Sequence, residues 1–551
     1  MGSTSLLHIV FVALSFTFSK ALPSDAGSGS PTVVLDTATF TGVTDGTSNR
    51  FLGIPFAEPP IGDLRFRFPL ANPPYIGSHN ATQFGPACSQ QRPNVTFPPE
   101  LAPEAAGFLN SSLAILDFPQ SEDCLTLNVW TPAGTQVDAG LSVAVWIYGG
   151  GFELGGTSSY DGAIIVNRSV SLNRPIIYVS MNYRLSALGF LAGKEVKQAG
   201  VANLGLQDQR RAFQWVQKYI CAFGGDPSKV TIFGESSGAM SIGAHLVAND
   251  GDTGGLFRGA FMESGSPLPV GDVTEGQPLY DTIVAQVGCT GSSDTLECLR
   301  QAPFDRLKAA MDASPSLFDA TAGEVFAWAP RADGAYITDC PQELVLQGKV
   351  ARIPVVNGDC DDEGTIFGVA SLNVTTESAF RSYLKQFWSP GFTSTDVAKL
   401  SQAYSANITE GAPFGTGTQN ALTPQFKRIA AVLGDFVFHA PRRLFLQHIS
   451  GKQNTWSFLS KKFKSLPDLG SAHTSDIPNM YGPGDLTDYL INFVTNLDPN
   501  GRTVLNWPKY NTSTVQLLTL LDGTPSETIT TDTFREDGIS FIMELSLKHP
   551  L

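Results

Sequence analysis

Short apolar runs alternate with helical periodicity in the middle of the chain, and this alternation restricts the possible folds more than any other feature. Residues 143–148, 175–180 and 230–233 are rich in β-branched and aromatic side chains, as expected for strands buried on both faces. Residues 207–223 separate the last two runs and repeat apolar side chains at helical spacing. This order predicts parallel strands joined by right-handed crossovers. We therefore expect an α/β fold with a large, mostly parallel central sheet, and functional residues at the carboxyl ends of its strands.

Ser236 lies between the strand expected at 230–233 and an apolar, helical run at 239–247, in the sequence Gly-Glu-Ser-Ser-Gly. Strand, Gly-x-Ser-x-Gly and helix in this order are the context of a nucleophile elbow. Glycine is needed at both ends because the serine backbone is strained and larger side chains would collide with neighbouring backbone. The motif alone often arises by chance, but this context predicts that Ser236 is a nucleophile.

A serine hydroxyl needs a base, and His473 is the best candidate among the seven histidines. It lies late in the chain, in a loop of small residues at 470–476, and it fits the order serine, acid, histidine. The others lie near a chain end, in apolar helical runs or beside a glycosylation sequon: His8, His79, His245, His439, His448 and His549.

The acid that orients this histidine should follow a strand between Ser236 and His473. Residues 354–358 are predicted to form that strand, and four carboxylates follow at once: Asp359, Asp361, Asp362 and Glu363. Chemistry alone does not choose among them, and for most of them a solvated acidic turn is the plainer expectation.

Three consecutive glycines at 149–151 follow the strand expected at 143–148. Glycines let backbone N–H groups approach a reacting carbonyl oxygen closely, so this segment is a candidate oxyanion loop. A phosphate-binding loop is disfavoured because no Lys-Ser/Thr follows, and a dinucleotide site is disfavoured because the GxGxxG spacing is absent.

The amino-acid composition restricts the kinds of molecule that the protein can be expected to bind. Apolar residues form 42% of the chain and charged residues only 16%, which predicts a large core and a surface with few charges. The formal net charge is −15 and no basic run occurs, so nucleic acid is not expected as a partner.

Residues 1–21 contain a short apolar run and end in Ser-Lys-Ala, as expected for a signal peptide; a buried N-terminal helix is the alternative. No other stretch approaches about 18 uninterrupted apolar residues, so we expect no integral membrane segment in the mature chain. These features predict a secreted, extracellular protein with a single catalytic domain over residues 22–551. Seven N-glycosylation sequons agree with export: Asn80, Asn94, Asn110, Asn167, Asn373, Asn407 and Asn511.

Seven cysteines cannot all pair within the chain. Cys88 with Cys124, and Cys289 with Cys298, are candidate disulfides. Cys221, Cys340 and Cys360 would then remain; a bridge between the last two is an alternative to the buried free thiols that we expect.

Several segments resemble the type-B carboxylesterase, lipase and cholinesterase family of α/β-hydrolases. Residues 223–238 (FGGDPSKVTIFGESSG) look like its serine signature, residues 122–130 (EDCLTLNVW) like its second signature, and residues 53–60 (GIPFAEPP) like its opening motif. The resemblance covers about residues 32–545 with the motifs in the expected order. It implies the α/β-hydrolase fold, with helices on both faces of the central sheet and neither a metal nor an organic cofactor.

The resemblance also implies roles for particular residues. Glu363 is the implied acid, because Asp362-Glu363-Gly364 matches the family's Asp-Glu-Gly. The implied oxyanion donors are the N–H groups of Gly150, Gly151 and Ser237. The two disulfides of fungal members match Cys88–Cys124 and Cys289–Cys298, and buried ion pairs are implied for Arg65 with Glu122 and Arg184 with Asp208.

The segment between Cys88 and Cys124 resembles the mobile amphipathic lid of fungal lipases. Its apolar positions recur near helical spacing: Leu101, Ala105, Phe108, Leu109, Ser112, Leu113 and Leu116. An ordinary surface helix is the alternative. The segment contains no Trp for a cation–π contact, so choline esters are disfavoured.

We therefore expect a secreted serine hydrolase that cleaves lipophilic carboxylic esters, such as long-chain acylglycerols or sterol esters, with the lid at a lipid–water interface. A short-chain or aromatic carboxylesterase is the alternative within the family. A catalytically silent adhesion or binding module is the alternative outside it.

Overall fold

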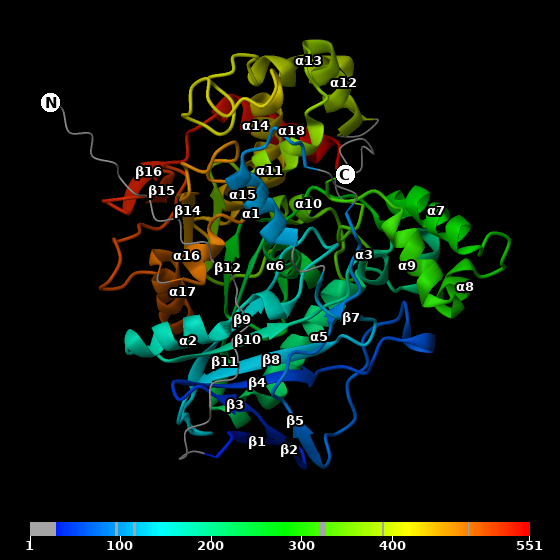
Figure 1. The fold of residues 1–551 in the computed structure, drawn as a ribbon, viewed down its shortest axis with the longest axis vertical. Coiled ribbons are helices and arrows are strands. Elements are labelled where there is room, and N and C mark those ends of the chain that lie inside the picture. The colour runs from blue at the N-terminus through cyan, green and yellow to red at the C-terminus, as the bar shows by residue number, and fades with distance from the viewer. Residues whose placement is uncertain (1–28, 94–96, 114–116, 319–326, 388–390, 483) are drawn as a thin grey trace.

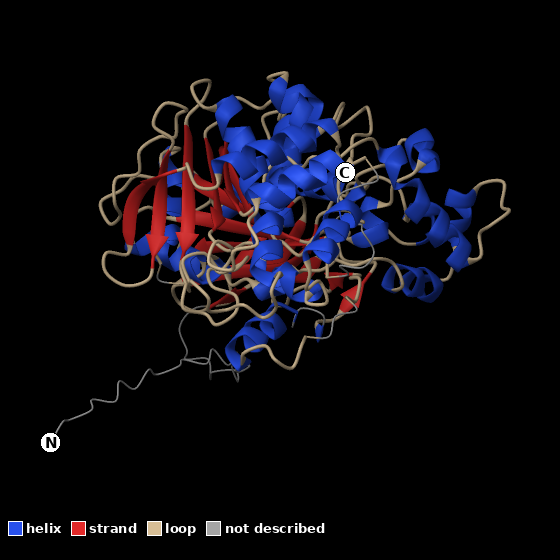
Figure 2. Cartoon of the chain, turned by 90° about the horizontal axis from the view of Figure 1, so that it is seen from above, coloured by secondary structure: helices blue, strands red, loops and turns tan. Residues whose placement is uncertain are grey.

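The computed structural model describes residues 29–93, 97–113, 117–318, 327–387, 391–482 and 484–551. The predicted signal peptide at 1–21 lies outside them, as do Asn94 and Leu116. The described residues form a large twisted sheet with helices packed around it (Figures 1 and 2).

The sheet has 11 strands, and its seven consecutive strands from β15 to β10 are parallel. Antiparallel strands extend both edges. In spatial order the strands are β16 (Glu527–Thr531), β15 (Gln516–Leu521), β14 (Thr455–Lys461), β13 (Val355–Cys360), β12 (Gly259–Glu263), β11 (Gly225–Glu235), β9 (Leu141–Ile147), β10 (Ile176–Met181), β8 (Thr126–Pro132), β4 (Ser48–Pro55) and β3 (Val43–Thr44).

Two small sheets accompany it. They contain β1 (Thr32–Leu35), β2 (Ala38–Thr41) and β5 (Ser78–Asn80), and β6 (Ala87–Cys88) with β7 (Gln120–Ser121).

The three predicted strands are confirmed as β9, β10 and β11, at the centre of the parallel region. Their side chains are almost all buried, and the rings of Trp146 and Phe233 pack with centroids 4.8 Å apart across neighbouring strands. The predicted helix at 207–223 begins earlier, as α5 (Leu204–Tyr219), and its last four residues tighten into a 3₁₀ turn. The predicted strand at 354–358 continues to Cys360, so Asp359 belongs to β13 rather than to a turn.

Helices cover both faces of the sheet, which confirms the expected α/β-hydrolase architecture. One layer contains α2 (Gly162–Ser171) and α17 (Asp485–Asn496), and the other contains α5, α6 (Ser237–Val247) and α15 (Ala440–Ile449). The remaining α-helices are α1 (Pro103–Leu113), α3 (Ser186–Phe190), α4 (Lys194–Ala199), α7 (Gln277–Val287), α8 (Thr295–Gln301), α9 (Phe304–Asp312), α10 (Pro341–Leu346), α11 (Thr365–Gly368), α12 (Glu377–Phe387), α13 (Ser394–Ala403), α14 (Phe426–Gly434), α16 (Ile477–Met480) and α18 (Glu536–Lys548).

Candidate active site

The serine turn joins the end of β11 to the start of α6. Ser236 has φ 55° and ψ −127°, a backbone conformation that is strained for a residue with a side chain. A Cβ at Gly234 would lie 2.6 Å from the carbonyl oxygen of Ile147, and one at Gly238 would lie 2.0 Å from the same atom. The neighbouring strand β9 therefore leaves no room for side chains on either side of the serine.

Ser236, His473 and Glu363 form a continuous chain of hydrogen bonds. His473 Nε2 lies 2.8 Å from Ser236 Oγ, and His473 Nδ1 lies 2.6 Å from Glu363 Oε2. The three residues follow β11, β13 and β14, so parallel strands bring their carboxyl ends together although the residues are far apart in sequence. All three are buried, and this arrangement allows the imidazole to take a proton from the serine hydroxyl.

Glu363 and the three carboxylates near it are all buried, so the expectation of a solvated acidic turn is wrong for them. Asp359 pairs with Arg442 at 2.7 Å, and Lys464 Nζ lies 2.6 Å from both Asp361 and Asp362. These three carboxylates are engaged by cations, whereas Glu363 contacts the imidazole.

Hydrogen-bond donors point at the carboxylate of Glu363 and stabilise its negative charge. The backbone N–H of Cys360 donates to Oε1 over 2.6 Å, and Oε2 faces His473. Burial raises the pKa of Glu363, while hydrogen bonds from Ser264 and Cys360 act in the opposite direction. The Nδ1–H of neutral His473 thus donates to Glu363, and Nε2 is left to accept the serine proton.

His473 lies against two phenylalanine rings. Its ring centroid is 4.6 Å from that of Phe438 and 5.5 Å from that of Phe367. Phe438 belongs to a π-helical turn, Asp435–His439, between α14 and α15. Burial lowers the pKa of His473, which favours the neutral base. Sequence periodicity gave no signal for either ring, because Phe438 lies in a single π-turn and Phe367 in the four-residue helix α11, and neither is long enough to show a repeating pattern.

The glycine loop has the conformation that the predicted oxyanion donors need. Gly150 has φ 116° and Gly151 has φ 63°, both in the region that favours glycine. A Cβ at Gly150 would lie 2.1 Å from the carbonyl oxygen of Leu154, so the turn also requires glycine sterically. Within the described part of the chain, the N–H groups of Gly150, Gly151 and Ser237 donate to no backbone carbonyl. They remain available to an oxyanion.

The segment predicted as a lid contains α1, which packs on the loop that carries His473. Leu101, Ala105 and Leu109 lie in one apolar cluster with residues of that loop and of α11 and α14: Ile366, Phe426, Leu469 and Ala472. The backbone N–H of Ala102 donates to the Asp468 carboxylate over 2.8 Å. The helix is therefore seated beside the candidate active site rather than on a remote surface.

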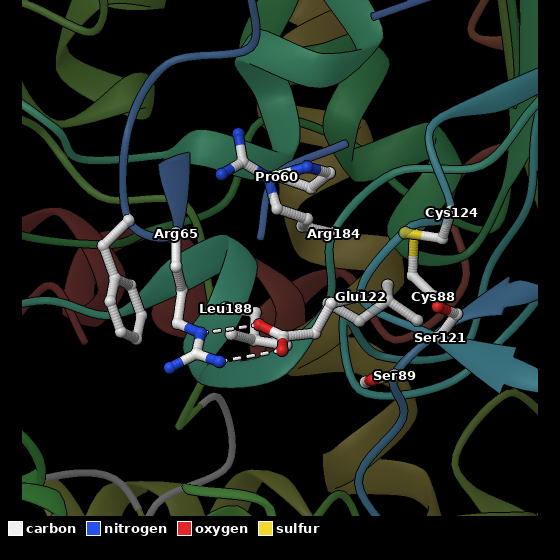
Figure 3. Close-up of a pocket in the computed structure, with 11 residues that line it drawn as sticks. Pro60, Arg65, Cys88, Ser89, Ser121, Glu122, Cys124, Arg184 and Leu188 are labelled. Carbon is white, nitrogen blue, oxygen red and sulfur yellow. Dashed lines mark hydrogen bonds and ion pairs between the residues drawn. A yellow bond between two sulfur atoms is a disulfide. The ribbon is translucent and has the colours of Figure 1, made fainter. Parts of the chain in front are cut away.

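Both predicted disulfides are present, Cys88–Cys124 and Cys289–Cys298. The predicted ion pairs are also present, with closest distances of 2.6 Å for Arg65–Glu122 and 2.7 Å for Arg184–Asp208. Figure 3 shows that the first disulfide, Arg184 and the Arg65–Glu122 pair line a small pocket. Ser236 is not among the residues that line it. The disulfide joins the two ends of the 88–124 segment, and the Arg65–Glu122 pair anchors one of them.

Cys340 and Cys360 are buried free thiols as expected, but Cys221 is exposed, so the expectation of a buried thiol is wrong there. The difference arises because Cys221 follows the end of α5 and lies on the outer side of the 3₁₀ turn. Among the described sequons Asn167 is half-buried and the others are exposed: Asn80, Asn110, Asn373, Asn407 and Asn511. Their glycosylation stays a prediction.

A parallel sheet with a strained serine turn after β11 and an acid–histidine pair beyond later strands defines an α/β-hydrolase. A family model of the carboxylesterase family matches residues 30–536, and the chain belongs to this family.

Named relatives agree with this assignment. The chain is 45% identical to "Lipase 2" of Diutina rugosa, over 89% of this chain and 91% of that protein. It is 37% identical to "Secreted triacylglycerol lipase LIP1" of Gibberella zeae, over 93% and 90% of the two chains. The crystal structure of Aspergillus niger EstA matches with a TM-score of 0.80 at 27% identity, covering 95% of this chain and 99% of that one.

The chain is therefore a carboxylic ester hydrolase. This finding contradicts the alternative of a catalytically silent binding module. None of the described helices has both the length and the hydropathy needed to cross a membrane.

Proposed function

We propose that this protein is a secreted serine esterase that cleaves lipophilic carboxylic esters, with Ser236 as nucleophile, His473 as base and Glu363 as the acid that orients it. The observation that carries this proposal is the unbroken chain of hydrogen bonds from Ser236 Oγ through the imidazole to Glu363 Oε2.

The reaction proceeds by two acyl transfers. His473 Nε2 takes the hydroxyl proton as Ser236 Oγ attacks the ester carbonyl carbon, and the carbonyl oxygen becomes an oxyanion. The N–H groups of Gly150, Gly151 and Ser237 donate to that oxyanion. The imidazolium then gives its proton to the leaving alcohol, and Ser236 carries the acyl group. Water, activated by His473, repeats the sequence and releases the carboxylic acid.

Glu363 acts through His473 and does not touch the substrate. Its carboxylate fixes the Nδ1–H tautomer and stabilises the imidazolium that forms in each transition state. The short contact between His473 Nδ1 and Glu363 Oε2 supports this role.

A lipophilic substrate is supported by the apolar walls of the site and by the relatives that are named lipases. Phe367 and Phe438 flank the imidazole, and α1 lays an apolar face beside it. We assign α1 and its flanks, between Cys88 and Cys124, as a lid that meets a lipid–water interface. Export is supported by the expected signal sequence at 1–21 and by relatives named as secreted.

The test combines a variant with a substrate series. Ser236→Ala should lower hydrolysis of p-nitrophenyl esters by at least about 10⁴-fold, with the thermal midpoint of unfolding retained. The wild-type enzyme should prefer long acyl chains and should gain activity when the substrate aggregates. Near-normal turnover by Ser236→Ala would contradict the assignment of the nucleophile. A short-chain optimum without a gain at the interface would instead support the short-chain or aromatic carboxylesterase.

A further inference from the structure

Three buried carboxyl groups lie behind the candidate triad and have no part in the proposed reaction. Glu235 ends β11, Glu263 ends β12, and Asp476 lies three residues after His473. Their exposed fractions are 2%, 0% and 0%. Glu235 and Glu263 are direct partners in the register of two neighbouring parallel strands, so their side chains share one face of the sheet. We call these three residues the carboxyl cluster.

The cluster contains five buried oxygen atoms that have no hydrogen-bond partner among the described residues. They are Oε1 of Glu235, both carboxyl oxygens of Glu263 and both carboxyl oxygens of Asp476. One of them, Oε1 of Glu235, lies 3.3 Å from His473 Nε2. Buried polar atoms are rarely left unpaired, and a buried charge without a partner is far more costly than a neutral group.

Among the described residues, no Lys or Arg balances the charge that the carboxyl cluster would carry if ionised. Within the described ranges, no ion pair joins a Lys or Arg to any of its three members, and no group of His, Cys, Asp and Glu has the geometry of a metal site. The other titratable groups that face it are Tyr160, Tyr183, Tyr481, Cys360, Glu363 and His473. The tyrosines and the thiol are neutral in neutral solution, and burial raises their pKa values further.

Glu363 differs from the cluster in the number of its donors. Cys360 N–H, the Ser264 hydroxyl and the imidazole all support its charge. Among the described residues, Asp476 receives support from the Cys360 thiol, a weak donor, and from its own backbone N–H, and Glu235 faces His473 Nε2 only at 3.3 Å. Two anions on adjacent strands at Glu235 and Glu263 would also repel each other. A protonated carboxyl group is both a donor and an acceptor, so neutral acids can satisfy one another's unpaired oxygen atoms.

From this geometry we infer that Glu235, Glu263 and Asp476 keep their protons near neutral pH. As neutral acids they place no negative charge behind His473, which leaves its imidazole free to act as the base. The inference rests on the proposed roles of Ser236 and His473.

The directions of the pKa shifts agree. Burial and the Asp476 carboxyl raise the pKa of Glu263 well above its usual range. Burial, with Asp476 and Glu363, raises the pKa of Glu235 against the opposing effect of His473, and burial with Glu363 raises that of Asp476 against His473 and a hydrogen bond from the Cys360 thiol. Burial also raises the pKa of Glu363, to about 8, so the contrast between Glu363 and the cluster rests on the donors that point at Glu363.

An ionised cluster would oppose catalysis at neutral pH. Negative charge on Glu235 or Asp476 would favour the imidazolium form of His473 and raise its pKa. A single anion within about 5 Å would raise that pKa by more than about one pH unit. Glu363 already favours the imidazolium, so this added charge would increase the fraction of resting enzyme whose imidazole is protonated and cannot accept the proton of Ser236.

Infrared difference spectroscopy measures the protonation directly. At pH 7 ordinary carboxyl groups are almost fully ionised, so the wild-type protein should show a carbonyl stretching band of protonated carboxyl groups that Glu263→Gln weakens. The band should shift in D₂O and should fade in the wild type between pH 7 and pH 10. Absence of a protonated-carboxyl band in the wild type at pH 7 would overturn the inference. This measurement needs no turnover, so it stays interpretable if Ser236 is not the nucleophile.

The pH profile of kcat/KM supplies the functional readout. Glu263→Gln replaces a neutral acid by a neutral amide, so the acid limb set by His473 should move by less than about 0.3 pH unit, whatever happens to kcat. Asp476→Asn is the matched second variant. Below pH 6 its acid limb should also move by less than about 0.3 pH unit. A downward move of the acid limb by about one pH unit or more in either variant would show that an anion had been removed, and would overturn the inference.

Discussion

Replacing Glu363 by Gln tests how the acid acts on the imidazole. In the structure one carboxyl oxygen accepts from Cys360 N–H and the other faces His473 Nδ1, each over 2.6 Å. An amide can offer an oxygen to only one of these donors, so its NH₂ group opposes the other. The imidazole is then driven toward the tautomer that carries its proton on Nε2, where it cannot accept the proton of Ser236.

The magnitude follows from the same contact. The attraction between an imidazolium and a carboxylate 2.6 Å apart is about 6 kcal/mol at an effective dielectric constant near 20. Loss of that stabilisation in the transition state corresponds to about a 10⁴-fold decrease in kcat. KM should change little, because Glu363 does not touch the substrate.

The assay is steady-state hydrolysis of a soluble p-nitrophenyl ester at saturating substrate. Asp361→Asn is the matched control, because Asp361 lies two residues away and is also buried but pairs with Lys464. Its kcat should stay within about threefold of the wild type. If Glu363→Gln kept more than a tenth of wild-type kcat, or if both variants lost activity equally, the assignment of the acid would be refuted.

Three further predictions concern the turn, the base and the disulfide. Gly238→Ala should unfold at a markedly lower temperature than the wild type, with a loss of about 3 kcal/mol or more, because its Cβ would lie 2.0 Å from a backbone oxygen. Gly107→Ala is the control, because its Cβ would meet no atom within 4 Å, and it should unfold at the wild-type temperature. If the two variants had equal thermal midpoints, the steric argument would be refuted. Because burial lowers the pKa of His473 from its usual value of about 6.5, kcat/KM should be retained at that pH and should fall only at lower pH, as the imidazole gains a proton. An acid limb above pH 7 would contradict this. Replacing Cys88 and Cys124 together by Ala should lower the free energy of unfolding by about 4 kcal/mol, because the disulfide joins residues 36 apart in sequence. Chemical denaturation measures this change, and a loss under about 1 kcal/mol would contradict the prediction.

The central strands, the serine turn and the histidine could be predicted because each depends on local sequence. Gly234 and Gly238 are required by one close approach to β9, and that requirement is visible as a motif. His473 follows from the order of the chain and from the unsuitable surroundings of the other histidines. The two disulfides followed from resemblance, since spacing alone left the pairing open.

Other parts of the site depend on contacts between distant segments. Four carboxylates lie at or just after the end of β13, and only the contacts of Arg442 and Lys464 show which of them are already paired. The π-turn that brings Phe438 to the imidazole has no repeating signal. Glu263 and Asp476 lie more than 200 residues apart in sequence, and only the sheet brings them close enough for Asp476 to raise the pKa of Glu263.

Covalent labelling tests the central claim most directly. The wild-type protein, treated with a fluorophosphonate and digested, should carry one phosphonyl group per chain, on the peptide that contains Ser236. His473→Ala should react far more slowly, and Ser236→Ala should carry no adduct and hydrolyse no ester. A label on any other residue, or ester hydrolysis that survives in Ser236→Ala, would contradict the account.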